Sequence, residues 1–275
     1  MKLQIKRLIS QIFFLLSANL GALNLKTGFC VPFFYCNACP AASSACPLRA
    51  LELSVFKVFN HPNNFSLKLF LYPIIILGGV GILTGRAVCG WACPIGFLQR
   101  ATSIVARFLK NKFPFFKKIG QHKIERYLRY CKYFVLIGLV FFTSIFIGFV
   151  FTDICPVGVL TGTFPIMILK PGVYVPSSYF YPALIIFILF FFLIFLVERG
   201  WCRYFCPIGA FLAPFNKISY IHMKVDTKKC KHCNICSDVC PMGIDVPNMN
   251  RDPECILCGK CVSKCPYSVV KFERV

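Results

Sequence analysis

The chain has 275 residues, of which 57% are hydrophobic and only 15% are charged. Its formal net charge is +21 at pH 7, but the apolar residues are gathered into long blocks, which favours basic loops beside an anionic membrane over a nucleic-acid-binding protein. A disulfide framework is typical of short secreted domains, so it does not suit eighteen cysteines in a chain of this length.

Four apolar segments have about the length of a membrane-spanning helix, at residues 8–23, 67–83, 133–151 and 179–197. Basic residues precede the first segment, a layout that also fits a signal peptide, but no clear small-x-small cleavage site follows it. None of the four segments carries a charge at its centre, so the sequence does not indicate a proton or ion path through them. We therefore predict an all-α integral membrane domain with four helices over residues 1–215.

The basic residues are distributed unevenly between these segments. Residues 86–132 hold eleven Lys and Arg, residues 199–275 hold twelve and residues 1–7 hold three, whereas residues 24–68 hold four and residues 152–179 hold one. The positive-inside rule then places both termini in the cytoplasm and the two poorly charged segments outside. The sequence therefore predicts a multi-pass protein of the cytoplasmic membrane.

The membrane domain contains a two-helix internal repeat. Each half consists of a helix, a Cys-Pro pair at Cys46 or Cys155, a second helix, and then Cys-x-x-x-Cys-Pro-Ile-Gly at 89–96 or 202–209. Repeats of this kind commonly pack about a pseudo-twofold axis along the membrane normal. We therefore predict an inner site near that axis, formed by the thiols of Cys89, Cys93, Cys202 and Cys206.

Three interpretations of the inner site remain open. Thiols at positions i and i+4 of a helix have Cβ atoms about 5–6 Å apart, so each pair can hold one side of a shared iron–sulfur cluster. A redox-active dithiol or docking surface, and a mononuclear metal, are the alternatives, while structural disulfides are rare in a reducing cytoplasm. The proline after the second cysteine is expected to stop the helix that carries the pair.

The C-terminal tail carries two copies of Cys-x-x-Cys-x-x-Cys-x-x-x-Cys-Pro, which begin at Cys230 and Cys255. This is the bacterial spacing for two [4Fe–4S] clusters, in which the fourth cysteine of each copy ligates the other cluster. Structural zinc usually takes two separated cysteine pairs and suits the spacing less well. The predicted ligands are Cys230, Cys233, Cys236 and Cys265 for the first cluster, and Cys255, Cys258, Cys261 and Cys240 for the second.

Residues 222–275 resemble two-cluster bacterial ferredoxins, which are small α+β domains. With four predicted membrane helices and Cys-x-x-x-Cys-Pro after the second and the fourth, most of the chain resembles the NapH/NosR-type membrane polyferredoxins. The resemblance implies an accessory role in which electrons pass between a cytoplasmic or quinone donor and a respiratory partner. It also implies protein partners such as a quinol-linked or periplasmic reductase.

The segment between the first two predicted helices departs from that family. Cys36-x-x-Cys39-Pro and Cys46-Pro place thiols there, and the repeat brings in Cys155-Pro. We predict an outer site for a further cluster, with Cys36, Cys39, Cys46 and Cys155 as its ligands. One or two disulfides in an oxidising periplasm are the alternative.

Motifs for other cofactors are absent from the sequence. The four histidines lie outside the predicted spans and no Cys-x-x-Cys-His occurs, so haem is not expected. Neither a Walker loop nor Gly-x-Gly-x-x-Gly is present, so no nucleotide or flavin is expected either. These absences favour an electron-transfer subunit over a stand-alone enzyme. The alternatives are a membrane copper-ion or thiol reductase, and a redox-sensing assembly or regulatory factor.

Three single residues near the predicted helix ends have structural interpretations. Cys131 has no partner motif, so its thiol is expected to pack against its neighbours. Trp91 and Trp201 are expected to act as anchors at the membrane interface.

Overall fold

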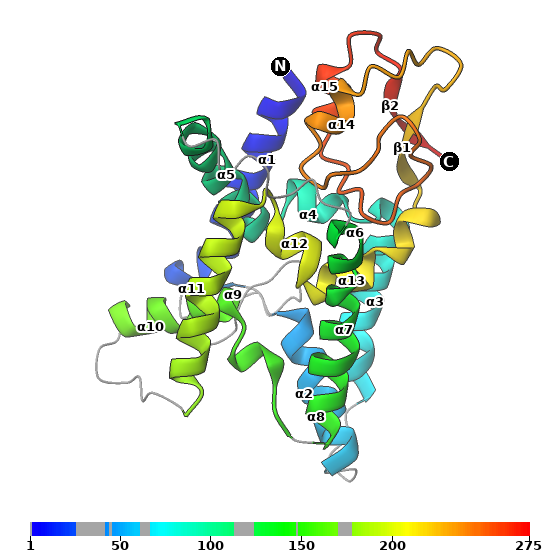
Figure 1. The fold of residues 1–275 in the computed structure, drawn as a ribbon. Coiled ribbons are helices and arrows are strands. Elements are labelled where there is room, and N and C mark those ends of the chain that lie inside the picture. The colour runs from blue at the N-terminus through cyan, green and yellow to red at the C-terminus, as the bar shows by residue number, and fades with distance from the viewer. Residues whose placement is uncertain are drawn as a thin grey trace.

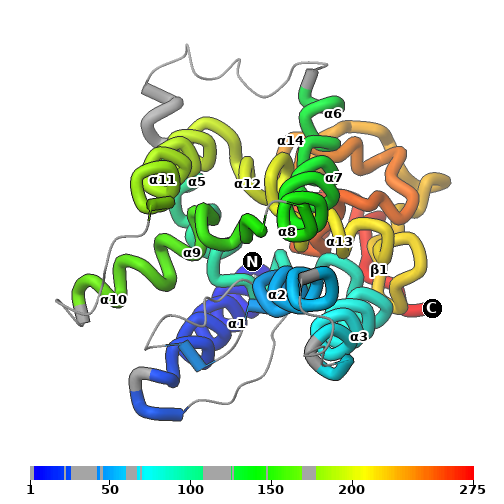
Figure 2. The backbone as a smooth tube through the Cα atoms, turned by 90° about the horizontal axis from the view of Figure 1, so that it is seen from below, coloured from blue at the N-terminus to red at the C-terminus, as the bar shows by residue number. Residues whose placement is uncertain are grey.

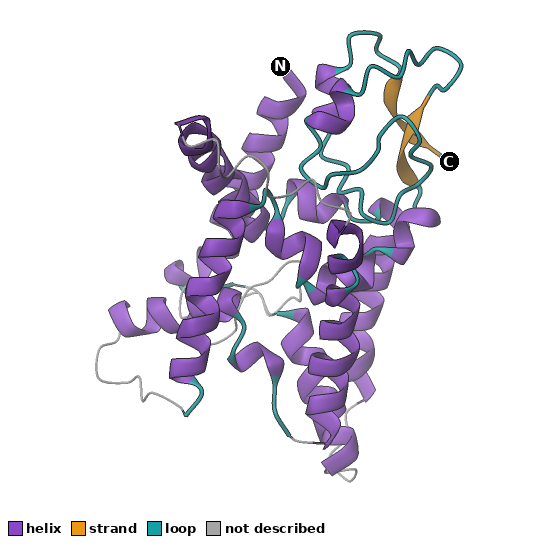
Figure 3. Ribbon diagram, in the orientation of Figure 1, coloured by secondary structure: helices purple, strands orange, loops and turns teal. Residues whose placement is uncertain are grey.

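The computed structural model describes residues 2–25, 42–43, 46–60, 67–112, 124–146, 148–169 and 178–275. Cys30, Cys36 and Cys39 lie outside these residues. The described chain is mostly helical, with a two-stranded sheet in its C-terminal tail (Figure 3). Figure 1 shows that the N-terminus and the tail lie at the same end of the helical body.

The first half of the helical body contains helices over the first two predicted spans and one helix between them that the sequence did not predict. This additional helix, α2, packs against α3 and against α8 of the second half. The elements of the first half are α1 (Lys2–Ala18), the 3-10 turn η1 (Leu20–Leu23), α2 (Pro47–Asn60), α3 (Leu67–Thr84), α4 (Ala87–Trp91) and α5 (Pro94–Lys112).

The second half begins with α6 and repeats the pattern with more irregular helices. Two π-helical stretches, η4 and η6, interrupt its α-helices. Its elements are α6 (Ile124–Leu128), α7 (Cys131–Phe134), η4 (Val135–Phe142), α8 (Thr143–Phe146), η5 (Phe151–Asp153), α9 (Pro156–Gly158), η6 (Val159–Thr163), α10 (Phe164–Leu169), α11 (Phe180–Leu196), α12 (Gly200–Tyr204), α13 (Pro207–Leu212) and η7 (Pro214–Lys217). In the part of the chain that the structure describes, no helix combines the length and the apolar character that a membrane crossing requires.

The two halves correspond element by element. In chain order α1 matches α7–η4–α8, α2 matches α9–η6–α10, α3 matches α11, and the short α4 matches α12. The halves also pack against each other, with α11 on α5 and α13 on α7 and η4. Seen from below, the long helices of both halves stand side by side in projection (Figure 2). The repeat therefore produces one interleaved body.

The prolines after the repeated cysteines begin helices. Pro47, Pro94, Pro156 and Pro207 are the first residues of α2, α5, α9 and α13. The prediction that proline stops a helix carrying both cysteines is therefore wrong, since α4 ends at Trp91, before Cys93, and α12 ends at Tyr204, before Cys206. Proline suits the first helical position because its missing N–H has no partner inside the helix there.

The tail is a small unit built around its cysteines. Its strands β1 (Ile221–Val225) and β2 (Val270–Arg274) pair antiparallel, with Val225 opposite Val270. Two short helices, α14 (Ile235–Asp238) and α15 (Lys260–Lys264), complete it. Its core contains a few apolar side chains packed among the cysteines. A unit this small needs its bound cofactors to supply part of its stability.

Candidate iron–sulfur sites

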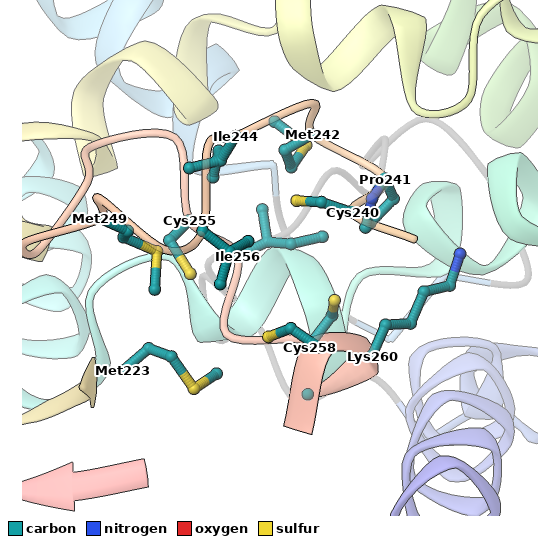
Figure 4. Close-up of a pocket in the computed structure, with 13 residues that line it drawn as sticks. Met223, Cys240, Pro241, Met242, Ile244, Met249, Cys255, Ile256, Cys258 and Lys260 are labelled. Carbon is teal, nitrogen blue, oxygen red and sulfur yellow. The ribbon is translucent and has the colours of Figure 1, made fainter. Parts of the chain in front are cut away.

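The predicted ligands of the second tail cluster line one pocket. Figure 4 shows Cys240, Cys255 and Cys258 around it, and Cys261 also belongs to its lining. The other lining side chains are mostly apolar, such as Met242 and Ile244, and about 340 Å³ of the pocket is not filled by atoms, part of it open to solvent. The fourth cysteine of the first motif thus joins three cysteines of the second motif, as the bacterial spacing requires.

The chemistry of this pocket suits a metal cluster. Burial raises the pKa of the Cys261 thiol to about 12 and also raises the pKa of Cys255. Buried thiols of this kind become thiolates when a metal ion binds them, because its positive charge replaces the lost solvation. The residues therefore fit a [4Fe–4S] cluster that four thiolates hold in an apolar setting.

The predicted ligands of the first tail cluster lie nearer the surface. Cys236 is buried and is an electrostatic neighbour of Cys265, while Cys230 and Cys265 pack at the edge of the tail's core. Cys233 is exposed. The first site is therefore the more accessible of the two to a soluble redox partner.

No three His, Cys, Asp or Glu side chains among the described residues lie close enough to share a single metal ion, and this includes the eight tail cysteines. Thiolates on one zinc ion are about 3.8 Å apart, because each Zn–S bond is about 2.3 Å. A cluster holds its thiolates further apart because iron and sulfide ions lie between them.

The structure brings the four inner thiols together. Cys89, Cys93, Cys202 and Cys206 are each between 5% and 7% exposed, and each interacts electrostatically with others of the four. Burial raises the pKa of Cys93 to about 12 and raises the pKa values of Cys89 and Cys206 as well. The inner site is therefore a buried set of thiols contributed equally by both halves of the repeat.

Hydrogen-bond donors point at three of the four inner sulfur atoms. The backbone N–H of Gly96 donates to Cys93 Sγ at 3.4 Å, and that of Gly209 donates to Cys206 Sγ at 3.3 Å. Gln99 Nε2 lies 3.2 Å from Cys202 Sγ. Donors of this kind stabilise negative charge on sulfur and tune iron–sulfur centres. Sequence reasoning did not identify Gln99.

The second tail pocket packs directly against the inner site. Gly90 follows Cys89, and a Cβ atom at this position would overlap the carbonyl oxygen of Ile256. The indole Nε1 of Trp91 donates to the Leu257 carbonyl at 2.8 Å. Arg7 Nε of helix α1 donates to the Gly90 carbonyl at 2.8 Å. The loop between two predicted cluster ligands, Cys255 and Cys258, therefore touches the short helix α4 that carries Cys89.

These contacts correct the interpretation of the tryptophans as interfacial anchors. Trp91 is part of the contact between the inner site and the tail. Trp201 is 5% exposed and packs against the rings of Phe190 and Phe205. Trp91 is half-buried in α4 and Trp201 is buried in α12, so both rings contact other parts of the protein. Cys131, expected to pack, is half-buried at the start of α7.

Polar side chains fasten the tail to the helical body from a second direction. Asn216 donates through Nδ2 to the carbonyls of Asp252, Pro253 and Cys255 and accepts from the backbone N–H of Arg86 at 2.8 Å. The carboxylate of Glu254 forms an ion pair with Arg86 Nη1 at 2.9 Å and a second ion pair with Lys132. The tail is thus held rigidly beside the inner site.

The predicted outer site is described only in part. Cys36 and Cys39 lie outside the described residues. Cys46 and Cys155 are 6% and 2% exposed and belong to the same buried core as three of the inner cysteines, Cys89, Cys93 and Cys206. They directly precede α2 and α9, which both begin in the central part of the helical body (Figure 1). The described half of the outer site is therefore deep in the protein.

Contacts between the two halves join the segments beside these two cysteines. Arg49 Nη1 lies 2.7 Å from an Asp153 oxygen, and Glu52 Oε2 accepts from the Thr152 hydroxyl at 2.8 Å. Because Arg49 and Glu52 follow Cys46 within two turns of α2, these bonds hold the starts of the matching elements α2 and α9 in one region.

Comparison with known families agrees with this arrangement of cysteines. The family described as "4Fe-4S binding domain" matches residues 69–115 and again residues 179–225, which are the corresponding parts of the two halves. The family described as "4Fe-4S dicluster domain" matches residues 222–266 in the tail. The chain is therefore an iron–sulfur protein of the ferredoxin type.

Individual relatives cover much of the chain. It is 30% identical over 275 residues to the uncharacterized protein MJ0750 of Methanocaldococcus jannaschii, which covers 99% of this chain and 96% of that protein. It is 26% identical over 219 residues to the ferredoxin-type protein NapH of Haemophilus influenzae, covering 76% of this chain and 69% of NapH. It is 27% identical over 225 residues to the regulatory protein NosR of Stutzerimonas stutzeri, covering 78% of this chain and 28% of NosR.

The chain belongs to the NapH/NosR-type polyferredoxins. Its general role is therefore that of an iron–sulfur electron-transfer protein in a redox chain. No solved structure matches it.

Proposed function

We propose that the protein is a membrane-bound electron carrier that passes electrons between a cytoplasmic or quinone donor and a respiratory partner. In this proposal the two tail clusters and the inner site are successive stations. The observation that supports it most strongly is the direct contact of Gly90, beside Cys89, with the Ile256 carbonyl of the second tail site. A short, solvent-free separation of redox centres is what an electron carrier needs.

The tail would hold two [4Fe–4S] clusters, each of which supplies a one-electron couple. Cys230, Cys233, Cys236 and Cys265 would ligate the first, and Cys255, Cys258, Cys261 and Cys240 the second. The chain's own residues position these thiols and surround the second site with mostly apolar side chains. The exposed Cys233 makes the first site the natural point of exchange with a partner in solution.

The membrane location rests on exposed apolar faces of the helices. On α11 the exposed residues fall on one face with helical spacing, and none of the seventeen residues of this helix is charged. Helix α3 and the segment α7–η4–α8 also expose large apolar side chains. A soluble monomer rarely exposes apolar surface on this scale, whereas a bilayer covers it. The exposed side chains of α11 are Tyr181, Ile185, Ile188, Leu189 and Phe192.

The proposed orientation places the tail and the N-terminus in the cytoplasm. Figure 1 shows both at one end of the helical body. The segments richest in Lys and Arg, residues 86–132 and 199–275, connect to that end, in accordance with the positive-inside rule. The tail clusters would therefore meet cytoplasmic or quinone-linked partners.

Redox-poised EPR with iron and sulfide quantitation after anaerobic purification tests the proposal. The tail alone accounts for about eight irons, and an inner [4Fe–4S] cluster would raise this to about twelve. We expect Cys206→Ser to remove one EPR component and about four irons, whereas Cys131→Ser, a matched cysteine outside every motif, should change neither.

Two results would contradict parts of the proposal. If Cys206→Ser kept every signal and the full iron content, the inner site would hold no cluster and a dithiol or docking role would replace it. If the wild type held no more than about eight irons, the proposed outer cluster at Cys36, Cys39, Cys46 and Cys155 would be excluded together with the inner one.

A further inference from the structure

Two buried arginines occupy equivalent positions in the repeat. Arg86 and Arg199 each stand three residues before the first cysteine of their motif, Cys89 or Cys202. Their side chains are 0% and 1% exposed. The guanidinium group keeps its positive charge at any pH at which proteins fold. A buried cation of this kind is stable only when anions or oriented dipoles surround it.

Each arginine contacts the cysteine of the other half. Arg86 Nη2 donates to the carbonyl of Cys202 at 3.2 Å, and Arg199 Nη1 donates to the carbonyl of Cys89 at 2.6 Å. The two contacts are crosswise and follow the pseudo-twofold relation of the repeat. The pair of arginines therefore lies on opposite sides of the inner site.

The glycine that ends each motif makes room for these arginines. A Cβ atom on Gly96 would lie 2.7 Å from Arg199 Nη1, and one on Gly209 would lie 2.9 Å from Arg86 Nη2. Both distances are shorter than ordinary contacts to a Cβ atom. The repeated Pro-Ile-Gly therefore serves the inner site, since its glycine admits the arginine of the opposite half.

The positive charge of the arginines exceeds the negative charge of the neighbouring carboxylates. Arg86 shares its carboxylate partner, Glu254, with Lys132. Arg199 has no ion pair among the described residues, and the carboxylate next to it in sequence, Glu198, pairs with Lys260. Two buried nitrogens, Arg86 Nε and Arg199 Nη2, have no hydrogen-bond partner within the described chain. The site is thus short of an anion.

We propose that the inner thiols bind an anionic iron–sulfur centre as thiolates, and that Arg86 and Arg199 balance its charge from opposite sides. This inference rests on the proposed function and specifies the state of its inner site. Four neutral thiols would supply no anion, so a resting dithiol site would leave Arg199 unbalanced. An oxidised [4Fe–4S] core with four thiolates has a net charge of about −2, which fits the excess of positive charge.

The arginines then set the reduction potential of the inner centre. Cys89, Cys93, Cys202 and Cys206 would hold a centre that accepts one electron from, or gives one electron to, a cluster held by Cys240, Cys255, Cys258 and Cys261, and this exchange would need no bond made or broken and no proton moved. Reduction adds one negative charge, which nearby fixed cations stabilise. The hydrogen bond from Gln99 to Cys202 Sγ acts in the same direction.

The test compares Arg199→Gln, Arg199→Lys and Gln99→Leu by redox titration followed by EPR on the full-length protein. The signal to follow is the component that Cys206→Ser removes. Arg199→Gln should lower the equilibrium constant for reduction of that centre about tenfold, which is 59 mV for a one-electron couple. Arg199→Lys keeps the charge and should keep most of the potential. Gln99→Leu should lower the potential by a smaller amount.

Arg203→Gln is the matched control. Arg203 is a buried arginine in helix α12, four residues after Arg199, but it pairs with Glu125, and among the described residues it donates to no inner cysteine carbonyl. Arg203→Gln should change the equilibrium constant for reduction of the inner centre by less than about twofold.

Three results would overturn the inference. One is an unchanged potential in Arg199→Gln with full iron content. Another is an equal fall of the potential in Arg199→Gln and Arg199→Lys, which would show that the shape of the arginine side chain matters and its charge does not. The third applies if Arg199→Gln fails to fold. In that case the inference is overturned when Gln99→Leu leaves the potential of the inner centre unchanged and Arg199→Lys lowers it. A missing inner signal in the wild type would instead refute the proposed inner cluster itself.

Discussion

At the scale of single residues, glycines and buried polar groups decide how closely the cysteine loops approach each other. Gly90 lets helix α4, which carries Cys89, touch the second tail site, and Gly96 and Gly209 leave room for the arginines of the opposite halves. A side chain at any of the three positions would push apart groups that must stay close for electrons to pass. These glycines therefore matter because they lack a side chain and leave room for a neighbouring group. Backbone conformation is not the reason, since none of the three has a positive φ angle.

Replacing Gly96 with alanine should weaken the inner site. The new Cβ atom would lie 2.6 Å from the Cys89 carbonyl oxygen, a backbone atom that cannot move away easily. Overpacking of this kind destabilises a protein by about 1–3 kcal/mol. We expect a lower unfolding temperature in detergent and partial loss of the iron that Cys206→Ser also removes.

Gly79→Ala is the matched control for this substitution. Gly79 lies in helix α3 with no atom within 4 Å of the added Cβ. Alanine in an open helical position stabilises by about 0.5–1 kcal/mol relative to glycine. Equal unfolding temperatures and iron contents for the two variants would show that the close approach at Gly96 is unimportant.

Glu52 gives the protein a predicted pH dependence. This carboxyl group lies on α2, outside the four proposed membrane spans, and burial raises its pKa from the ordinary 4.5 to about 7. Hydrogen bonds from Thr152 and the charge of Arg49 oppose the rise, while Asp153 adds to it. Because ionisation is harder in the folded state, stability should fall as the pH rises from about 4.5 to about 7, and the loss should persist above that.

Glu52→Gln should remove this loss. The rise in pKa corresponds to on the order of 3 kcal/mol of folding free energy at pH 8. The variant should therefore unfold at a higher temperature than the wild type at pH 8 and at nearly the same temperature at pH 5. Thermal unfolding measured at both values checks this, and a difference that does not change with pH would contradict it.

At the scale of elements, the unexpected feature is a pair of helices that begin inside the helical body. Helices α2 and α9 begin in the middle of the helical body, directly after Cys46 and Cys155. Apolar length alone did not reveal them, because α2 is amphipathic and carries Glu52 on a buried face. They carry the described cysteines of the proposed outer site into the core that also contains three of the inner cysteines.

The connection between η7 and the tail is a second feature at this scale. Asn216 makes most of its hydrogen bonds. Asn216→Ala would leave three half-buried carbonyls and the buried N–H of Arg86 without this partner. We expect a loss of about 2–3 kcal/mol and faster loss of the second tail cluster in air. Differential scanning fluorimetry and the decay of cluster absorbance would measure both effects.

Asn248→Ala is the corresponding control in the tail. Asn248 is exposed and donates to the exposed carboxylate of Asp245 at 2.7 Å. Surface substitutions of this kind change stability by less than about 0.5 kcal/mol. If Asn216→Ala behaved like Asn248→Ala, the contacts of Asn216 would not hold the tail in place.

At the scale of the whole molecule, the tail packs against the end of the helical body that carries the inner thiols. The proposed topology predicts that a reporter fused after Val275 lies in the cytoplasm, so only a reporter that works in the cytoplasm is active there. A reporter fused after residue 175 should be active only outside the cytoplasm, and one fused after residue 115 should again be cytoplasmic. Alkaline phosphatase and green fluorescent protein fusions at these points distinguish the two sides, and an inverted or uniform pattern would refute the topology.

The sequence by itself was sufficient for the features that depend on short spacing. The two tail motifs, the paired Cys-x-x-x-Cys-Pro motifs and the helices over residues 67–83 and 179–197 each occupy a continuous stretch of chain. Such local patterns predict helices and cluster ligands directly; the two helices are confirmed, and the ligand assignment stays a prediction. Family membership followed from the same motifs.

Only the tertiary structure decided what surrounds the inner thiols. Arg199 meets the Cys89 carbonyl, and Asn216 meets Cys255, across long separations in the chain, which no local pattern encodes. Aligning the two motifs does show that Arg86 and Arg199 are equivalent, but it does not show that each serves the opposite half. That exchange depends on how the repeats pack, because a contact between distant segments exists only once the chain has folded.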